Sequence, residues 1–501
     1  MANVNWIHNL PFFSIFLAMF CGIITALIKD GKKAYMLHTA MVSIVFVMSG
    51  ILLLNLSKNQ ETFSYMMGHY PAPWGNELRA GPLEALMAVT FSIVMLLTVG
   101  GGLNFIMKDV VEEKQPLYFI MLNALFGSML ALIYTNDIFT AYVFIEINTI
   151  ASCALIMVKG TAESIVGTTY YLVISLLGSG LFLLGLSILY SITGHLLFPQ
   201  MQEAVFKLIA TRQYTMPLMV VTGFMFIGIA IKSALFPFHA MLPGAYNVAL
   251  PTSSAILSGL ALKSYIVLGI KLIYCVFSES VMHTLKITEV LFAFGLAGMV
   301  MGSVYAMQEH KMKRMLAYSS VAQIGYIFMG IGMGSRVGMT AACFHILAHA
   351  VTKPLLFLCC GSFVEDNGGK DKMYHMRGAA LRNPLAGVGY TVGALSMIGI
   401  PLMAGFISKI YFATASVYTP GKMAAVLIVL GISMVLNALY FLPTVIAIWS
   451  PVKKLAKKTR ATISPMFAVS IVGFIILNFA LGIYYRPITR IIQVSIGLLV
   501  Q

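Results

Sequence analysis

Charged and titratable side chains inside long apolar runs are the residues of this sequence that could carry ions. A charge at mid-bilayer depth costs at least about 2.5–3.5 kcal/mol on insertion scales, and residues of this kind usually mark an ion path or a proton relay. The runs hold one glutamate, four lysines and two histidines of this kind: Glu146, Lys232, Lys263, His345, His349, Lys353 and Lys409. Their types favour proton transfer.

Glu146 is the one acidic residue deep inside a run, and its natural partner is a buried lysine, with Lys232 as the first choice. A fixed ion pair that locks two helices together is the alternative. One carboxylate cannot neutralise three or more buried lysines, however. The other lysines therefore need water or must lose their protons part of the time, and such lysines can carry protons.

His345, His349 and Lys353 are spaced i, i+4, i+8, so they line one helix face over about 12 Å. Histidine titrates near neutral pH and can pass a proton through either ring nitrogen. Zinc binding is an alternative, but no nearby Glu or Cys completes a ligand set. Polar contacts that hold helices together are a second alternative. We expect a proton relay and no metal site.

Two further titratable residues lie near the ends of runs. Lys271 is about one turn from the end of the eighth run, where it either joins the relay or extends its charge to the membrane surface. His239 closes the seventh run, and we expect it to contact water.

The elements that position these residues are membrane helices. The chain is 59% hydrophobic and 10% charged, whereas soluble domains carry about 25% charged residues. Apolar runs of about 20 residues cross a bilayer as helices, since barrel strands are shorter and alternate. We predict an all-α membrane protein of about 14 transmembrane helices, at residues 10–28, 34–56, 82–107, 115–134, 137–158, 164–193, 216–239, 250–277, 285–307, 314–334, 337–363, 385–417, 422–449 and 463–485.

The net charge of +15 resides in short loops between the runs, so it does not indicate nucleic-acid binding. The positive-inside rule places basic loops in the cytoplasm, and both termini then lie on the outer side of the cell membrane. Loops after odd-numbered runs hold most of the basic residues, with clusters at Lys29/Lys32/Lys33, Lys311/Lys313/Arg314 and Lys453/Lys454/Lys457/Lys458/Arg460.

The seventh and twelfth runs are interrupted, because each holds a proline within eight residues of its lysine, Pro237 after Lys232 and Pro401 before Lys409. Interrupted helices at corresponding positions of two halves indicate a transporter with inverted repeats. The expected division is N-terminal helices at 1–114, five-helix repeats at 115–277 and 278–449, and a C-terminal helix at 450–501.

No redox or hydrolytic active site is indicated. The sequence lacks GxGxxG, Walker, nucleophile-elbow and haem-ligand patterns, and its six cysteines show no CxxC spacing. We therefore expect no cofactor in this chain, which could still serve as the translocating subunit of an oxidoreductase complex.

Several segments resemble the antiporter-like subunits shared by respiratory complex I, Mrp-type Na+/H+ antiporters and membrane-bound hydrogenases. In chain order they are Phe-Ile-Glu at 144–146, 232–239, 243–252 with Lys263, 313–320, 345–353 and 405–409. The resemblance implies a 14-helix subunit with broken helices 7 and 12. It also implies that Glu146, Lys232, Lys263 and Lys409 are channel residues, with the histidines of helix 11 between the halves.

Two details of the resemblance point to the Mrp D subunit and its hydrogenase relatives, namely Tyr-Pro-Ala-Pro-Trp-Gly at 70–75 and a lysine at 409. Relatives often carry a lysine early in helix 6, where this chain has Thr168 and Thr169. The long lateral helix of the largest such subunits is not expected after helix 14.

The resulting prediction is a proton-translocating subunit of an Mrp-type or complex I-like assembly. Its partners would be the lipid bilayer and other membrane subunits. The transported ion would be H+, and Na+ is a second candidate. An autonomous secondary transporter and a non-conducting scaffold subunit stay open as alternatives.

Overall fold

The computed structural model describes residues 6–70, 75–211, 214–451 and 463–500. Residues 71–74 of the segment at 70–75, and the basic cluster from Lys453 to Arg460, lie outside the described residues. Among the described residues, 13 helices are long and apolar enough to cross a membrane, which confirms the predicted all-α membrane protein. They are α1 (Leu10–Thr25), α2 (Gly31–Asn59), α3 (Pro82–Asp109), α4 (Gln115–Tyr134), α5 (Ile138–Met157), α6 (Ala162–Thr193), α8 (Thr215–Lys232), a continuous helix over Pro251–Phe277, α13 (Ile287–Gln308), α14 (Met312–Gly332), α15 (Arg336–Asp366), α19 (Pro420–Trp449) and α20 (Pro465–Ile483).

Both predicted interruptions occur. The seventh span, α8, ends at Lys232, and a short 3-10 turn, η4 (Phe238–Ala240), leads into α9 (Met241–Val248). The twelfth run divides into two half-helices, α17 (Pro384–Ile398) and α18 (Ala404–Val417), each of which is too short to be among the 13 spans. That the pair forms the fourteenth crossing stays a prediction. Each break lies beside a proline, which lacks the amide donor that a continuing helix needs. The inverted relation of the two halves and the domain boundaries stay predictions.

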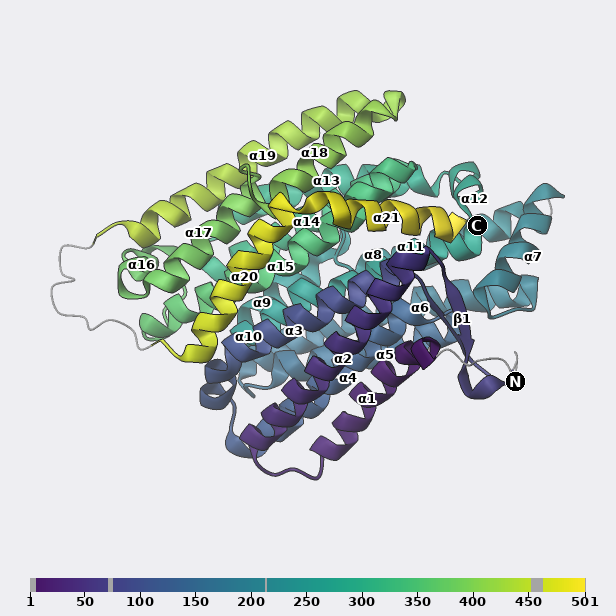
Figure 1. The fold of residues 1–501 in the computed structure, drawn as a ribbon. Helices are drawn as coiled ribbons and strands as arrows, with labels where there is room; N and C mark the ends of the chain where they lie inside the picture. Colours follow the sequence, from purple (N-terminus) through teal and green to yellow (C-terminus); the bar gives the residue numbers. More distant parts are fainter. Residues whose placement is uncertain (1–5, 71–74, 212–213, 452–462, 501) are drawn as a thin grey trace.

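The two ends of the bundle carry different elements (Figure 1). The basic end carries α16 (Ala379–Arg382) and the loop between α1 and α2. The backbone of Lys311 pairs with that of Lys372, which lies in the segment before α16. The opposite end is called the hairpin end here, and it carries β1 (Phe63–Met66), β2 (Glu77–Ala80), α7 (Phe198–Ala210), α12 (Glu279–Thr284) and α21 (Tyr485–Val500). The β1–β2 hairpin, α7 and α21 were not predicted, because short strands and amphipathic helices lack a long apolar run.

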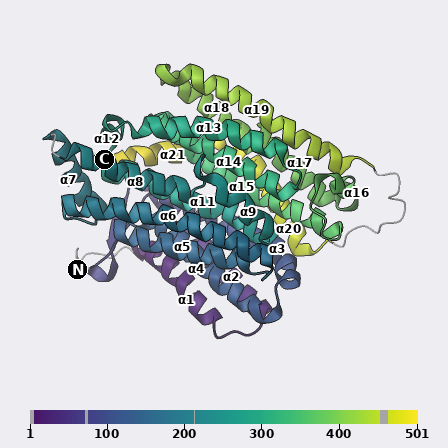
Figure 2. The ribbon, with the colours of Figure 1, turned by 180° about the vertical axis from the view of Figure 1, so that it is seen from behind.

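Two central helices are buried along their whole apolar length, the helix over Pro251–Phe277 and α15. The first contains α10 (Pro251–Ile256), a π-helical stretch η5 (Leu257–Ala261), α11 (Leu262–Leu272) and a second π-helical stretch η6 (Ile273–Phe277). α1 and α19 lie on opposite flanks of the bundle in Figure 1, and Figure 2 shows α11 and α15 again between these flanks from behind. Helices buried on all sides are those best able to hold charged groups away from lipid.

Glycines bring α13 and α14 into close contact, and this contact supports the central face of α14. A Cβ atom at Gly302 on α13 would lie 2.5 Å from the backbone nitrogen of Ala322 on α14. A Cβ atom at Gly325 on α14 would lie 2.6 Å from the backbone nitrogen of Met299. Small residues at such crossings allow membrane helices to pack backbone to backbone.

We predict that Gly302→Ala destabilises the protein, because the added methyl group must push the two backbones apart. Overpacking of this kind costs about 1–3 kcal/mol. Gly431→Ala is the matched control, since nothing lies within 4 Å of a Cβ atom at that position. The free energy of unfolding in detergent should fall for Gly302→Ala alone. Equal stability of the two variants would show that the contact is not tight.

Candidate functional site

Six of the seven predicted site residues are deeply buried in the described structure. Lys232, Lys263, His345, His349, Lys353 and Lys409 are each 4% exposed or less. They project from α8, α11, α15 and α18, so the fold assembles residues that are up to 177 positions apart in sequence (409 − 232). Glu146 on α5 differs, because it is only half-buried.

Lys232 does not form the expected ion pair with Glu146 within the described residues. Its Nζ atom donates instead to Oγ1 of Thr149, on the same helix as Glu146, at 2.6 Å. The reason is geometric: Thr149 points into the bundle, whereas Glu146 lies on a partly exposed stripe of α5 with Val143 and Ile150. Glu146 is still close enough for its charge to act on Lys232.

Neutral oxygens continue the line from α5 to α11. Asn148, beside Thr149, accepts a hydrogen bond from the hydroxyl of Tyr265 at 2.8 Å. Tyr265 is two residues beyond Lys263 on α11. The polar contacts of α8, α5 and α11 therefore meet at residues 148–149, which were not among the predicted site residues.

Lys263 lies directly after the π-helical stretch η5 and donates to the backbone carbonyl of Ser258 within that stretch. The Ser258 hydroxyl is 2.9 Å from the hydroxyl of Ser320 on α14. A π-helical turn shifts the usual hydrogen-bond pattern and often marks a functional position. In this helix, the shifted pattern allows the backbone carbonyl of Ser258 to accept a hydrogen bond from Lys263.

Lys353 on α15 approaches the same part of α14 from the other side. Its Nζ atom donates to the carbonyl of Leu316 at 2.8 Å and to the hydroxyl of Ser319. Ser319 and Ser320 thus lie between Lys353 and Lys263. Both serines occur in the segment 313–320 that carried the family resemblance, and that membership was the only signal that could have identified them.

The two histidines follow on α15. His345 Nδ1 lies 2.9 Å from the hydroxyl of Ser408, the neighbour of Lys409, and the Tyr326 ring stacks on His345 at 5.4 Å between centroids. The His349 ring centroid lies 6.2 Å from that of His345. Neither ring nitrogen of His349 has a hydrogen-bond partner among the described residues.

Lys409 explains the position of the break in the twelfth span. Its Nζ atom donates to the last carbonyls of α17, Met397 at 2.6 Å and Ile398 at 2.5 Å. A helix C-terminus carries partial negative charge and stabilises a cation. The next residue, Gly399, has φ +97°, and a Cβ atom there would lie 2.8 Å from Lys409 Nζ. Only glycine fits this position.

His239 and Lys271, the two predicted residues near the ends of apolar runs, differ in their contacts. His239 packs between the rings of Phe236 and Tyr305, with centroids at 5.3 and 5.5 Å, and among the described residues its ring contacts involve aromatic side chains and not the buried lysines. Lys271 does not extend to the membrane surface. It is 1% exposed and donates to the carbonyls of Ile133 and Thr135 at the end of α4.

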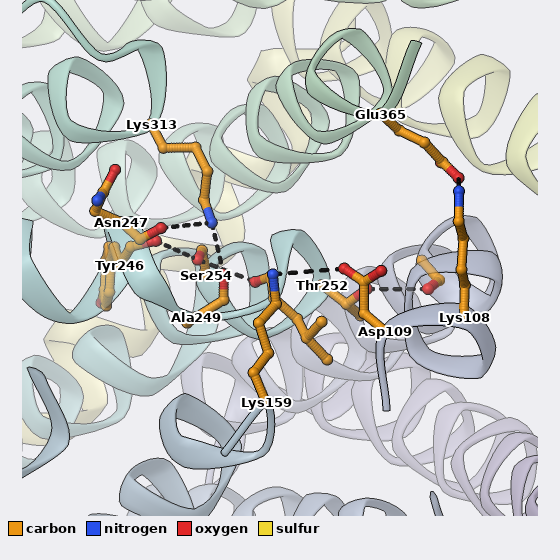
Figure 3. Close-up of polar contacts among 12 residues, drawn as sticks. Lys108, Asp109, Lys159, Tyr246, Asn247, Ala249, Thr252, Ser254, Lys313 and Glu365 are labelled. Atoms are coloured by element: carbon orange, nitrogen blue, oxygen red, sulfur yellow. Dashed lines mark hydrogen bonds and ion pairs between the residues drawn. The ribbon is translucent and has the colours of Figure 1, made fainter. Parts of the chain in front are cut away.

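A polar cluster at the basic end fastens the segment after the broken seventh span (Figure 3). Lys313 on α14 donates to the carbonyls of Asn247 at 3.0 Å and Ala249 at 2.6 Å. Ion pairs connect Lys159 to Asp109 at 3.4 Å and Lys108 to Glu365 at 2.5 Å. The sequence places Lys313 in a basic loop cluster, but the structure shows that it is buried and binds backbone.

No group of three or more His, Cys, Asp or Glu side chains within the described ranges is arranged to hold a metal ion. The buried polar residues from Lys232 on α8 to Lys409 on α18 are called the central line here. Hydrogen bonds within it join Lys232 to Thr149, Lys353 to Ser319 and His345 to Ser408. Such a set can donate and accept protons but offers no carboxylate or thiolate cage for a metal.

Comparisons with known proteins identify the family of this chain. Residues 135–437 match the family described as NADH:quinone oxidoreductase/Mrp antiporter, TM. The chain is 30% identical to NADH-quinone oxidoreductase subunit N of Desulforudis audaxviator, covering 85% of this chain and 83% of that protein. It is 28% identical to the D subunit of the Na(+)/H(+) antiporter of Alkalihalophilus pseudofirmus, covering 84% and 83%.

Two solved structures share the fold. A chain of the membrane-bound sulfane sulfur reductase, an archaeal respiratory membrane complex, matches with a TM-score of 0.85 and 25% identity over 99% of this chain and 97% of that chain. A chain of the Mrp complex from Dietzia sp. matches with a TM-score of 0.86 and 19% identity over 99% and 100%. The matched family segment and the first relative together show that this chain belongs to the NADH:quinone oxidoreductase/Mrp antiporter transmembrane family.

Proposed function

We propose that this chain is the proton-translocating, antiporter-like membrane subunit of a multi-subunit complex of the Mrp or complex I-like type. The observation that carries the proposal is the set of buried lysines and histidines from α8 to α18, in which the described hydrogen-bond acceptors of each lysine are hydroxyls or backbone carbonyls. Burying charges without counter-ions is costly, and their retention inside a membrane domain indicates ion movement.

The proposed path begins at Lys232 beside Glu146. Protons pass along the hydroxyls of Thr149 and Tyr265 to Lys263, with Asn148 orienting Tyr265 by accepting its hydrogen bond, and then along the serines of α14 to Lys353. The His349 and His345 rings pass them on to Ser408 and Lys409. Four hydrogen bonds support this path. They join Lys232 to Thr149 at 2.6 Å, Tyr265 to Asn148 at 2.8 Å, Ser258 to Ser320 at 2.9 Å and His345 to Ser408 at 2.9 Å. His349 is the central step, because buried ring nitrogens without protein partners normally bind water, which would hydrate the middle of the line.

Glu146 would act as the switch. At an effective dielectric of about 20, a charge pair 4 Å apart is worth about 4 kcal/mol. Gaining or losing that interaction changes the proton occupancy of Lys232 by about a thousandfold. A small movement of α5 toward or away from α8, driven by a partner subunit, would therefore load or release the first lysine.

The proposed orientation follows the basic residues. The basic end would face the cytoplasm and the hairpin end, with both termini, would face outward across the cell membrane. Partners would be the other membrane subunits of the complex, and this chain would carry no cofactor of its own. The relatives' names support the assignment to a multi-subunit complex, since one is a subunit of an NADH-quinone oxidoreductase and another a subunit of an Na+/H+ antiporter.

Two other functions fit the fold. An autonomous secondary transporter would keep its activity as a purified single chain in liposomes. A non-conducting scaffold would tolerate loss of Lys263 and Lys409. The buried lysines argue against the scaffold, because apolar residues of similar size would hold the helices together at lower cost.

We predict that Glu146→Gln and Lys232→Met each abolish proton transport by the assembled complex in vesicles. Removing a positioned proton-transfer group slows the transfer by about a hundredfold or more. Lys207→Met is the matched control, because Lys207 is exposed on α7 and pairs with Glu203. Copurification of the partner subunits checks assembly. Normal transport by both assembled variants would refute the mechanism.

We also predict that Ser319→Ala slows transport by about tenfold without loss of assembly. The substitution removes the hydroxyl that accepts from Lys353, and a hydrogen bond to a charged group is worth about 1.5–3 kcal/mol. Ser303→Ala on α13 is the control, since that buried hydroxyl donates to the carbonyl of Met299 and contacts no lysine. Equal rates for the two variants would exclude Ser319 from the path.

A further inference from the structure

Glu84 is a buried carboxylate at the hairpin end that the proposed path does not use. It lies in the first turn of α3 and is 2% exposed. Its Oε2 atom accepts a hydrogen bond from the backbone N–H of Gly81 at 3.1 Å. Its Oε1 atom has no hydrogen-bond partner among the described residues. A helix cap needs one carboxylate oxygen, so the cap leaves the second oxygen unexplained.

Two buried or partly buried basic residues of this region, Lys271 and Arg79, bind groups other than Glu84. Lys271 donates to the carbonyls of Ile133 at 2.8 Å and Thr135 at 2.6 Å, yet its charge and that of Glu84 interact. Arg79 on β2 donates to Sγ of Cys275 at 2.6 Å and to the carbonyl of Leu498 at 2.9 Å. Lys271 therefore interacts with the charge of Glu84 but forms no ion pair with it in the described structure.

The location connects the central line with one membrane surface. Lys271 is eight residues after Lys263 on the same central helix, about 12 Å nearer the hairpin end. Glu84 also interacts electrostatically with Cys343, two residues before His345 on α15. Gly81 and β2, which directly precede α3, form part of the hairpin end itself. Glu84 thus lies between the predicted relay and the surface.

We propose that Glu84 and Lys271 form a proton branch between Lys263 and the hairpin end. In this step the Lys271 ammonium gives one proton to the Glu84 carboxylate, which leaves a neutral amine and a carboxylic acid. The acid releases the proton to water at the hairpin end, and a proton from Lys263 restores the ammonium. The direction depends on the gradient. This inference rests on the proposed function of the central line.

The test compares Glu84→Gln with wild type in the purified, assembled complex. The glutamine carbonyl still accepts from Gly81, so the cap and the melting temperature should be retained. Infrared difference spectra between acidic and neutral pH should lose the carbonyl stretch of one protonated carboxyl group. Proton transport in vesicles should fall by about a hundredfold, as expected when a proton-transfer group is removed.

Glu279→Gln is the matched control, because Glu279 on α12 is a partly buried glutamate at the same end, and burial raises the pKa of its carboxyl. Loss of the Glu279 carboxyl should remove a different infrared band and leave proton transport unchanged. An unaltered spectrum for Glu84→Gln would overturn the proposal, and so would wild-type transport by that variant. If Lys232→Met abolishes transport while Glu84→Gln does not, the branch is wrong and the central line stands.

Discussion

The structure depends on one requirement, that each lysine inside the membrane must find oxygen atoms. Backbone carbonyls at irregular places in helices meet it here. Lys409 binds the last carbonyls of α17, Lys271 binds those of α4, and Lys263 binds a carbonyl of a π-helical turn. The end of a helix offers about half a negative charge, less than a carboxylate does. A lysine held in this way is stabilised without being fixed in its charged form, which is the state that a proton carrier needs.

The same requirement explains where the helices break. Irregular backbone at membrane depth is tolerated only when protein or a water-filled cavity surrounds it. The break between α17 and α18 is accordingly covered, with Asn478 of α20 accepting from the backbone of Ala404 at 3.3 Å and donating to Thr352 on α15 at 2.8 Å. The π-helical turn before Lys263 belongs to a helix that is buried along its whole apolar length. The burial of the central helices thus allows the irregular backbone whose carbonyls bind the buried lysines.

The residues that could be predicted are those whose presence in an apolar run is energetically costly, because such residues stand out in the sequence. A lysine or a proline in an apolar run is exceptional, so Lys232, Lys409 and both breaks can be identified from the sequence alone. Thr149 and Ser258 cannot, because hydroxyl residues are common at helix contacts, and Ser319 and Ser320 are signalled only by the family resemblance of their segment. Glu84 gives no signal either, since a carboxylate in the first turn of a helix has an ordinary role there. The choice of Thr149 over Glu146 by Lys232 depends on how α5 is rotated, and periodicity in a helix that is apolar on all sides does not determine that rotation.

The rotation of α5 also bears on whether the chain acts alone. Glu146 shares its helix face with Val143 and Ile150, which are 38% and 62% exposed, so the carboxylate lies at the edge of the bundle. In a single chain that face would meet lipid, where a charged carboxylate is costly. A neighbouring membrane subunit packed on α5 would cover the face and could bring a counter-charge to Glu146. The interaction between Glu146 and Lys232 would then depend on the neighbour, which favours a subunit of an assembly over an autonomous transporter.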